Sequence, residues 1–93
     1  MEQALSWLFP EPEDLGVFVT NDVFFDRTPV RWVARDLDGD WSFSGGMKFE
    51  THQTHMVRLS WVTNTFPDVA ALADLPLGWG AMKVASGWRR YEL

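Results

Sequence analysis

The chain contains no cysteine, only two histidines and no long apolar run, and each scarcity excludes a class of protein. Without cysteine there is no disulfide scaffold, thiol nucleophile, iron–sulfur cluster or cysteine-ligated zinc site. No stretch reaches the roughly 20 apolar residues that a transmembrane helix needs. The N-terminus is acidic, unlike the basic start of a signal peptide. We therefore expect a cytoplasmic protein that does not enter a membrane.

The 93 residues, 46% of them hydrophobic and 23% charged, suit one globular domain. The formal net charge of −5 argues against binding nucleic acid, because neutralising phosphates requires a clustered Lys/Arg face. Residues 1–16 contain four acids and no base, whereas the remainder is nearly neutral. We divide the chain into an acidic N-terminal arm, residues 1–15, and a single domain, residues 16–93.

Alternating apolar and polar residues predict strands in the first half of the domain. A strand is expected at residues 16–20, followed by a buried turn at 23–25. Residues 30–44 predict a β-hairpin around the Asp-Gly dipeptide at 38–39. In the first strand of this hairpin, we expect Val30, Trp32 and Ala34 to point inward and Arg31, Val33 and Arg35 to point outward.

The second half predicts one more strand at 56–59, two short helices over 59–74 and a closing hairpin at 79–93. We expect an α+β fold: a single domain with a mainly antiparallel sheet of about five or six strands and one or two short helices packed on one face. The tryptophans expected in the core are Trp32, Trp41 and Trp61, and those with more exposure are Trp7, Trp79 and Trp88.

No residue pattern indicates catalysis or a bound cofactor. His52 and His55 with Glu50 lack the spacing and the further ligand of a zinc site. The alternating acids at 36–40 lack the glycine and glutamate that a calcium loop requires. We therefore expect no metal, no cofactor and no enzymatic activity.

Four segments carry a family pattern when taken in order: residues 30–35 (VRWVAR), 40–45 (DWSFSG), 62–67 (VTNTFP) and 72–78 (LADLPLG). Together they resemble a bacterial domain-of-unknown-function family that is also described as a predicted immunity-protein family of polymorphic toxin systems. The resemblance covers residues 17–85. It implies an α+β fold and a protein that neutralises a toxin by binding it, with no catalytic residues of its own.

The residues expected to bind a partner lie in or near the predicted hairpin tip: Arg31, Arg35, Asp36, Asp38, Asp40 and Trp41. Charged and aromatic side chains there can anchor a protein, such as a toxin domain. Two alternatives stay open. One is a small-molecule-binding or enzymatic domain with a cleft near Ser44, His52 and His55. The other is an oligomerising structural domain, a homodimer in which the hairpin at 79–93 pairs with a second copy.

Overall fold

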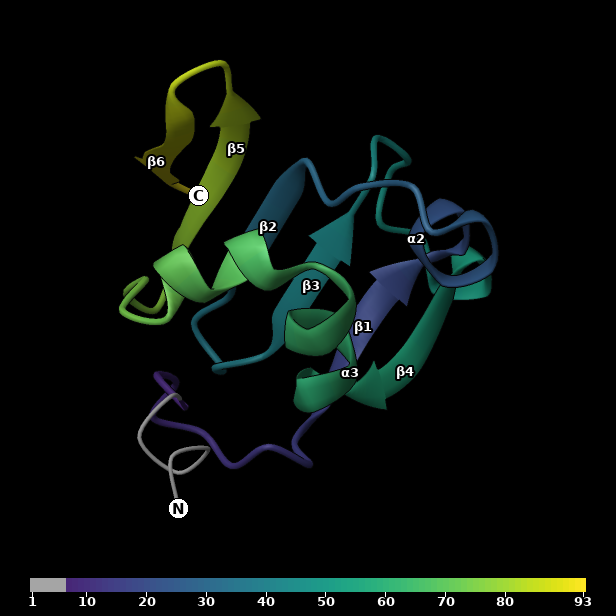
Figure 1. Cartoon of the computed structure of the whole chain (residues 1–93), viewed down its shortest axis with the longest axis horizontal. Coiled ribbons are helices and arrows are strands. Elements are labelled where there is room, and N and C mark those ends of the chain that lie inside the picture. The colour runs from purple at the N-terminus through teal and green to yellow at the C-terminus, as the bar shows by residue number, and fades with distance from the viewer. Residues whose placement is uncertain (1–6) are drawn as a thin grey trace.

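Six strands form one mixed sheet in the order β4-β1-β3-β2-β5-β6 (Figure 1). In chain order they are β1 (Gly16–Thr20), β2 (Trp32–Arg35), β3 (Trp41–Ser44), β4 (Thr54–Arg58), β5 (Trp79–Val84) and β6 (Gly87–Glu92). Neighbouring strands are antiparallel except for β1 and β3, which run parallel. The structure, a computed structural model, describes residues 7–93, with Thr51 described by its backbone alone.

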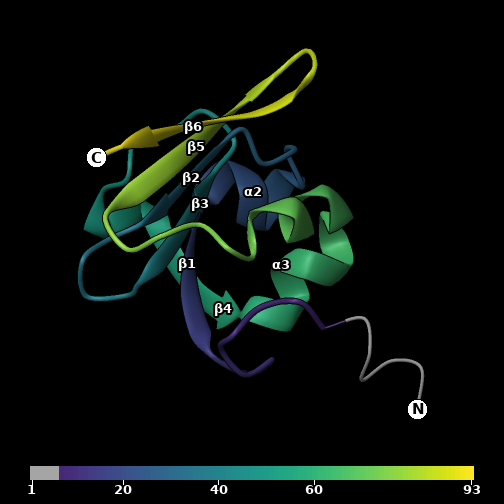
Figure 2. The same cartoon turned by 90° about the vertical axis from the view of Figure 1, so that its left-hand side faces the viewer.

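Short helices cover one face of the sheet. These are α2 (Asn21–Asp26), α3 (Leu59–Thr65) and the 3₁₀-helix η2 (Pro67–Leu72). Figure 2 shows them on one side, while the strands and the loop from β3 to β4 form the other side. That loop contains a single 3₁₀ turn, η1 (Thr51–Gln53). The fold is therefore a small α+β domain in two layers.

The core lies between the helices and the inner face of the sheet. Residues paired in register share a face, and the inner face carries the fully buried side chains of Val17, Val19, Val33, Trp41, Phe43 and Ala81. The helices add Val23, Leu59, Val62, Val69 and Leu72. Burial of this apolar set is the main favourable contribution to folding.

Several sequence predictions are confirmed by the strand and helix boundaries. The strand at 16–20 is β1, the predicted hairpin is the β2–β3 pair, and the closing hairpin is the β5–β6 pair. A helix ends at Thr65, and a second begins at Pro67, where the proline suits a first helical position.

The strand directions and one strand boundary require correction. β1 and β3 are parallel because the chain crosses through α2 to β2, whose hairpin then places β3 beside β1. The strand expected at 56–59 is Thr54–Arg58, and Leu59 instead begins α3 as a fully buried residue. The apolar side chain of Leu59 is thus buried by the helix rather than by the strand.

The predicted faces of the first hairpin strand are reversed. Val33 is buried and pairs with Phe43 and Ala81 of the inner face, whereas Trp32 and Ala34 lie on the outer face and are only half-buried. Val30 is buried as predicted, but it precedes the regular strand, so it does not set the alternation. Of the three tryptophans expected in the core, Trp41 is fully buried, while Trp32 and Trp61 are half-buried.

Some residues of the segment 7–15, which the sequence predicts to be part of an arm, contact the rest of the domain. Phe9 is 5% exposed and meets Trp41 edge-on, with ring centroids 5.3 Å apart. The backbone of Leu15 accepts a hydrogen bond from the amide of Leu59 at 2.8 Å. The part of the predicted arm at residues 1–6 lies outside the described residues.

Phe43→Ala tests the core at the centre of the sheet. Because Phe43 is fully buried, its truncation should lower the free energy of unfolding by about 3–5 kcal/mol. Urea unfolding followed by tryptophan fluorescence measures the loss. The control is Phe25→Ala, since Phe25 is 63% exposed; its loss should stay below about 1 kcal/mol. Equal losses for the two variants would contradict the described packing.

Candidate functional site

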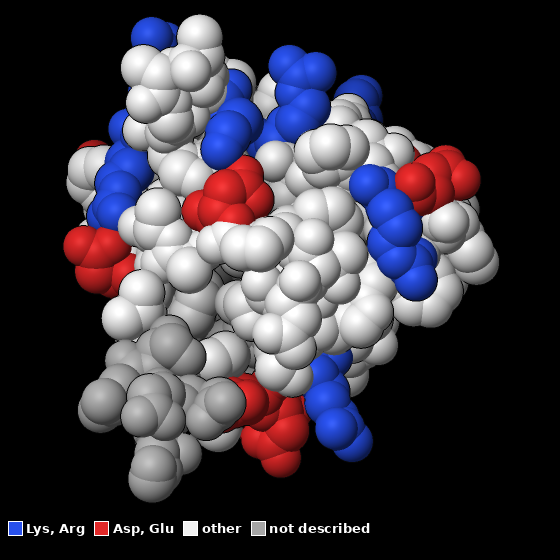
Figure 3. Space-filling view, in the orientation of Figure 1, with Lys and Arg blue, Asp and Glu red and all other residues white. Residues whose placement is uncertain are grey.

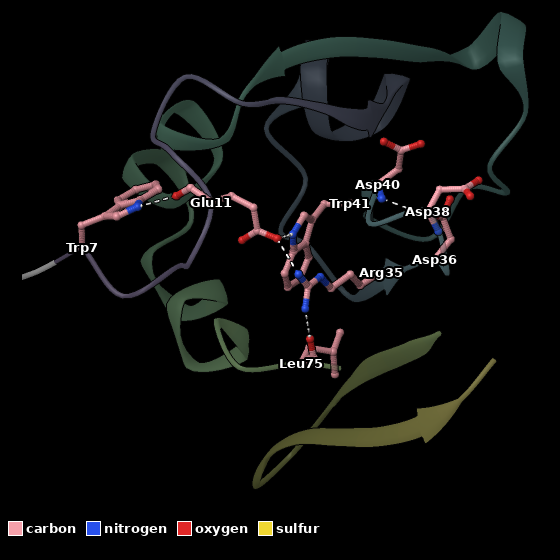
Figure 4. Close-up of polar contacts among 8 residues, drawn as sticks. All are labelled: Trp7, Glu11, Arg35, Asp36, Asp38, Asp40, Trp41 and Leu75. Carbon is pink, nitrogen blue, oxygen red and sulfur yellow. Dashed lines mark hydrogen bonds and ion pairs between the residues drawn. The ribbon is translucent and has the colours of Figure 1, made fainter. Parts of the chain in front are cut away.

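A carboxylate from the N-terminal segment joins two residues of the predicted partner site. Glu11 Oε2 accepts hydrogen bonds from Arg35 Nη2 at 2.8 Å and from the Trp41 indole Nε1 at 2.9 Å (Figure 4). Arg35 Nη1 donates to the carbonyl oxygen of Leu75 at 2.8 Å. Its guanidinium also lies 5.4 Å from the centroid of the Trp41 ring, within cation–π range. We call Glu11, Arg35 and Trp41 the Glu11 clamp.

The Glu11 clamp uses Arg35 and Trp41 inside the domain. Trp41 is fully buried, so it offers no surface to a partner. Arg35 points toward Glu11 and away from the hairpin tip (Figure 4). The placement of Arg35 and Trp41 favours a structural role, because Trp41 Nε1 and both Nη atoms of Arg35 bond within the domain. Arg35 Nε and Glu11 Oε1 are buried without a hydrogen-bond partner among the described residues.

The three aspartates of the predicted site do lie together at the exposed turn between β2 and β3. One carboxylate oxygen of Asp36 accepts from the amides of Asp38 and Asp40, at 2.9 and 3.0 Å. Gly39 has a φ of 92°, a conformation that glycine adopts readily. Carboxylate oxygens of Asp36, Asp38 and Asp40 lie within 4.8 Å of one another, so these are the described residues best placed to hold a cation. The turn itself accounts for their proximity.

The residues of the alternative cleft do not converge. His55 lies on the inner face of the sheet, where its ring stacks on Phe24 with the ring centroids 4.3 Å apart. Its Nε2 lies 2.7 Å from Asn21 Oδ1, at hydrogen-bond distance. Ser44 lies on the outer face, in register with Trp32. His52 is exposed, with Glu50 3.4 Å away. His55 and Ser44 thus lie on opposite faces of the sheet, and the groove that Ser44 lines, described below, contains neither histidine.

The Lys and Arg residues at inward positions of the strands are paired with acids. Besides Arg35, Lys83 bonds to Asp68 at 2.7 Å and Arg90 to Asp74 at 2.6 Å. The Arg90 guanidinium, through its hydrogen bond and its charge, holds the pKa of Asp74 below its usual range. In Figure 3, which views this side, several red and blue side chains adjoin one another around a largely uncharged centre.

The opposite, outer face of the sheet carries apolar residues with no helix over them in the described part of the chain (Figure 2). One row in register crosses all six strands: Met56, Phe18, Ser42, Ala34, Gly80 and Tyr91. Small residues form the middle of the row and large ones its ends. A Cβ on Gly80 would lie 2.9 Å from Leu93 and 3.1 Å from Tyr91, so both side chains lean over that glycine.

A groove of about 460 Å³ opens on this face, and we call it the outer-face groove. Its walls are Trp32, Met47, Lys48, Phe49, Tyr91 and Leu93. Ser44 fixes the loop that forms one wall, because its hydroxyl donates to the carbonyl oxygen of Met47 at 2.5 Å and accepts from the amide of Gly46 at 3.0 Å. The buried Ser44 thus has a structural role in shaping the groove.

A second depression of about 500 Å³ adjoins the groove, since Leu93 lines both. It is acidic, with Asp36, Asp38 and Glu92 beside Leu37 and Leu77. Eight large hydrophobic residues are exposed among residues 7–93, and five of them line these two depressions: Leu37, Phe49, Leu77, Tyr91 and Leu93. Exposed apolar side chains are thus concentrated in one region rather than scattered.

Sequence reasoning missed the outer-face groove because it assigned the wrong face of β2 to the core. Apolar residues occupy both faces of several strands, for example Phe18 between Val17 and Val19. That pattern was the available signal, since a strand with one solvated face alternates apolar with polar residues. Of the predicted site residues outside the Glu11 clamp, Arg31 is exposed just before β2, and Asp36 and Asp38 line the second depression.

No family model, curated protein or solved structure matches the chain. The resemblance to an immunity-protein family therefore stays a hypothesis. Within residues 7–93, no helix has the length and apolar character needed to cross a membrane.

Glu11→Ala tests whether the Glu11 clamp is structural. It leaves the Arg35 charge and the Trp41 indole N–H without their acceptor, and hydrogen bonds to charged groups contribute about 2 kcal/mol. We expect the free energy of unfolding in urea to fall by about that amount. Glu13→Ala is the control, because the exposed Glu13 contributes only a backbone carbonyl to Ser60. Similar stability of the two variants would refute the assigned role.

Proposed function

We propose that this chain is a non-enzymatic binding protein of the cytoplasm that neutralises a toxin by occupying its surface, as the family resemblance implies. Such a protein needs a preformed surface with apolar anchors and no chemistry of its own. The outer-face groove and the acidic depression beside it supply that kind of surface.

The observation that carries this proposal is the concentration of five exposed large hydrophobic residues around two adjoining depressions. Contiguous apolar patches are uncommon on monomers without a partner. Aromatic residues such as Trp32 and Tyr91 are typical anchors of protein interfaces. Asp36 and Asp38 of the hairpin tip line the second depression, which supports including them in the proposed site.

Affinity capture tests the proposed function. The tagged chain is incubated with lysate of its source organism at low and moderate salt, and co-purifying proteins are identified. We expect a stoichiometric toxin domain whose toxic activity disappears when an equimolar amount of the purified chain is added. Capture of no toxin domain, or of one whose activity is unaffected by the chain, would contradict an immunity role.

A small apolar ligand is the second candidate occupant of the groove. Its volume of about 460 Å³ falls within the range of about 300–1,000 Å³ typical of small-molecule sites. Native mass spectrometry of the protein purified from its source organism distinguishes this case. A bound mass that is lost in the Ala34→Glu variant supports it, because the new side chain projects onto the groove floor. Only the mass of the free chain would remove it.

A further inference from the structure

The basic residues of the outer face differ from those at inward positions of the strands in having no acidic partner. Outward positions of the strands carry Arg58 and Arg89, and Lys48 lines the outer-face groove. Among the described residues none of these three makes an ion pair, whereas Arg35, Lys83 and Arg90 on the helix side each do. Within residues 7–93, no Asp or Glu occupies an outward position of a strand.

The charged residues at outward strand positions are therefore all basic, although the chain as a whole carries a net charge of −5. The outward residues of β5 are Gly80, Met82 and Val84, and those of β6 are Gly87, Arg89 and Tyr91. Met82 joins Trp32 to Arg89 in one register row. The groove is thus an apolar surface flanked by Arg89 and Lys48. Charged groups across an interface are arranged in complementary pairs, which governs the choice of partner.

We infer that the outer-face groove binds an amphipathic helix of a partner protein whose apolar side is flanked by Asp and Glu. This inference deepens the proposed function and rests on it for the identity of the partner. A helix fits because the sheet already packs helices on its inner face, and a bound helix would complete a third layer. An extended segment would instead pair with the backbone at an edge strand, β4 or β6.

A second copy of the chain is a poorer occupant of the groove. In a two-fold dimer the same patch faces itself. Pairing groove with groove would bring Lys48 and Arg89 of one copy toward the same two residues of the other. Like charges placed opposite one another are unfavourable, so the charge pattern selects a different protein.

A display library of amphipathic helical peptides tests the inference even while the partner is unidentified. The library varies the apolar positions and the flanking positions, which can be acidic, neutral or basic, and it is selected against the immobilised full chain. We expect enrichment of peptides with acidic flanks. Enrichment of basic or neutral flanks, or no enrichment at all, would overturn the inference; basic flanks would direct attention to the acidic depression.

Two matched variants locate the binding. Ala34→Glu places a carboxylate on the groove floor, whereas Ala71→Glu places one on η2, at an exposed position of the helix side. We expect the selected peptides to bind Ala34→Glu at least about tenfold more weakly and Ala71→Glu unchanged. Circular dichroism and the urea midpoint verify that both variants fold. Equal binding by the two variants overturns the inference.

Charge reversal tests the role of the free basic residues. The double variant Lys48→Glu/Arg89→Glu should lose about tenfold in affinity for acid-flanked peptides and gain affinity for matched lysine-flanked ones. If the double variant still prefers acid-flanked to lysine-flanked peptides as the native chain does, Lys48 and Arg89 do not determine the choice of partner.

The outcomes for the inference and for the proposed function are separable. If a toxin domain is captured and inhibited but binds Ala34→Glu as well as the native chain, the groove is not its site and the immunity role stands. If peptides with acidic flanks bind the groove while no toxin is captured, the inference about the groove is supported and the immunity role is contradicted.

Discussion

The indole N–H of Trp41 is buried and therefore needs a hydrogen-bond acceptor inside the domain. Segments far apart in the sequence come together to supply that acceptor and to balance its charge. Trp41 lies at the centre of the inner face, fully buried and 6.0 Å from the Phe43 ring with which it stacks. A buried donor without an acceptor is costly, and Glu11 supplies the acceptor. A half-buried carboxylate in turn needs a positive charge, which Arg35 provides while it also bonds to the segment after η2 at Leu75. The N-terminal segment, the sheet and the η2–β5 connection are held together through this one group.

The two faces of the sheet differ in how their apolar side chains are covered and in how their basic side chains are paired. The proposed binding function rests on this difference. On the inner face, apolar side chains are covered by helices and basic side chains are matched with acids from the N-terminal segment and the η2 region. On the outer face, apolar residues are left without a covering layer and the basic residues are left without acids among residues 7–93. A face that combines exposed apolar side chains with unpaired charges of one sign is typical of an interface with a complementary partner.

The sequence predicted local structure better than it predicted the site. The hairpin at 30–44 was recognised because its turn and alternation are encoded within 15 residues. The parallel pairing of β1 with β3 could not be read in this way, because it depends on the crossover through α2 and involves residues far apart in sequence. The face of β2 was assigned wrongly because Trp32 and Val33 are both apolar, and only the pairing of Val33 with Phe43 and Ala81 decides between them. Arg35 was likewise expected at the surface because arginine is usually exposed. Its partner Glu11 lies in the segment that the sequence predicted to be a separate arm.

Amide chemical-shift mapping of the isotope-labelled chain in complex with its bound partner tests the central claim, that the outer face is the binding face. The account predicts shifts clustered at the outward residues of β2, β5 and β6 and in the loop at 45–50. It also predicts little change in α3 and η2, which lie on the other side of the sheet (Figure 2). Shifts centred on α3 and η2, or confined to the turn at 36–40, would contradict the account and move the interface elsewhere on the domain.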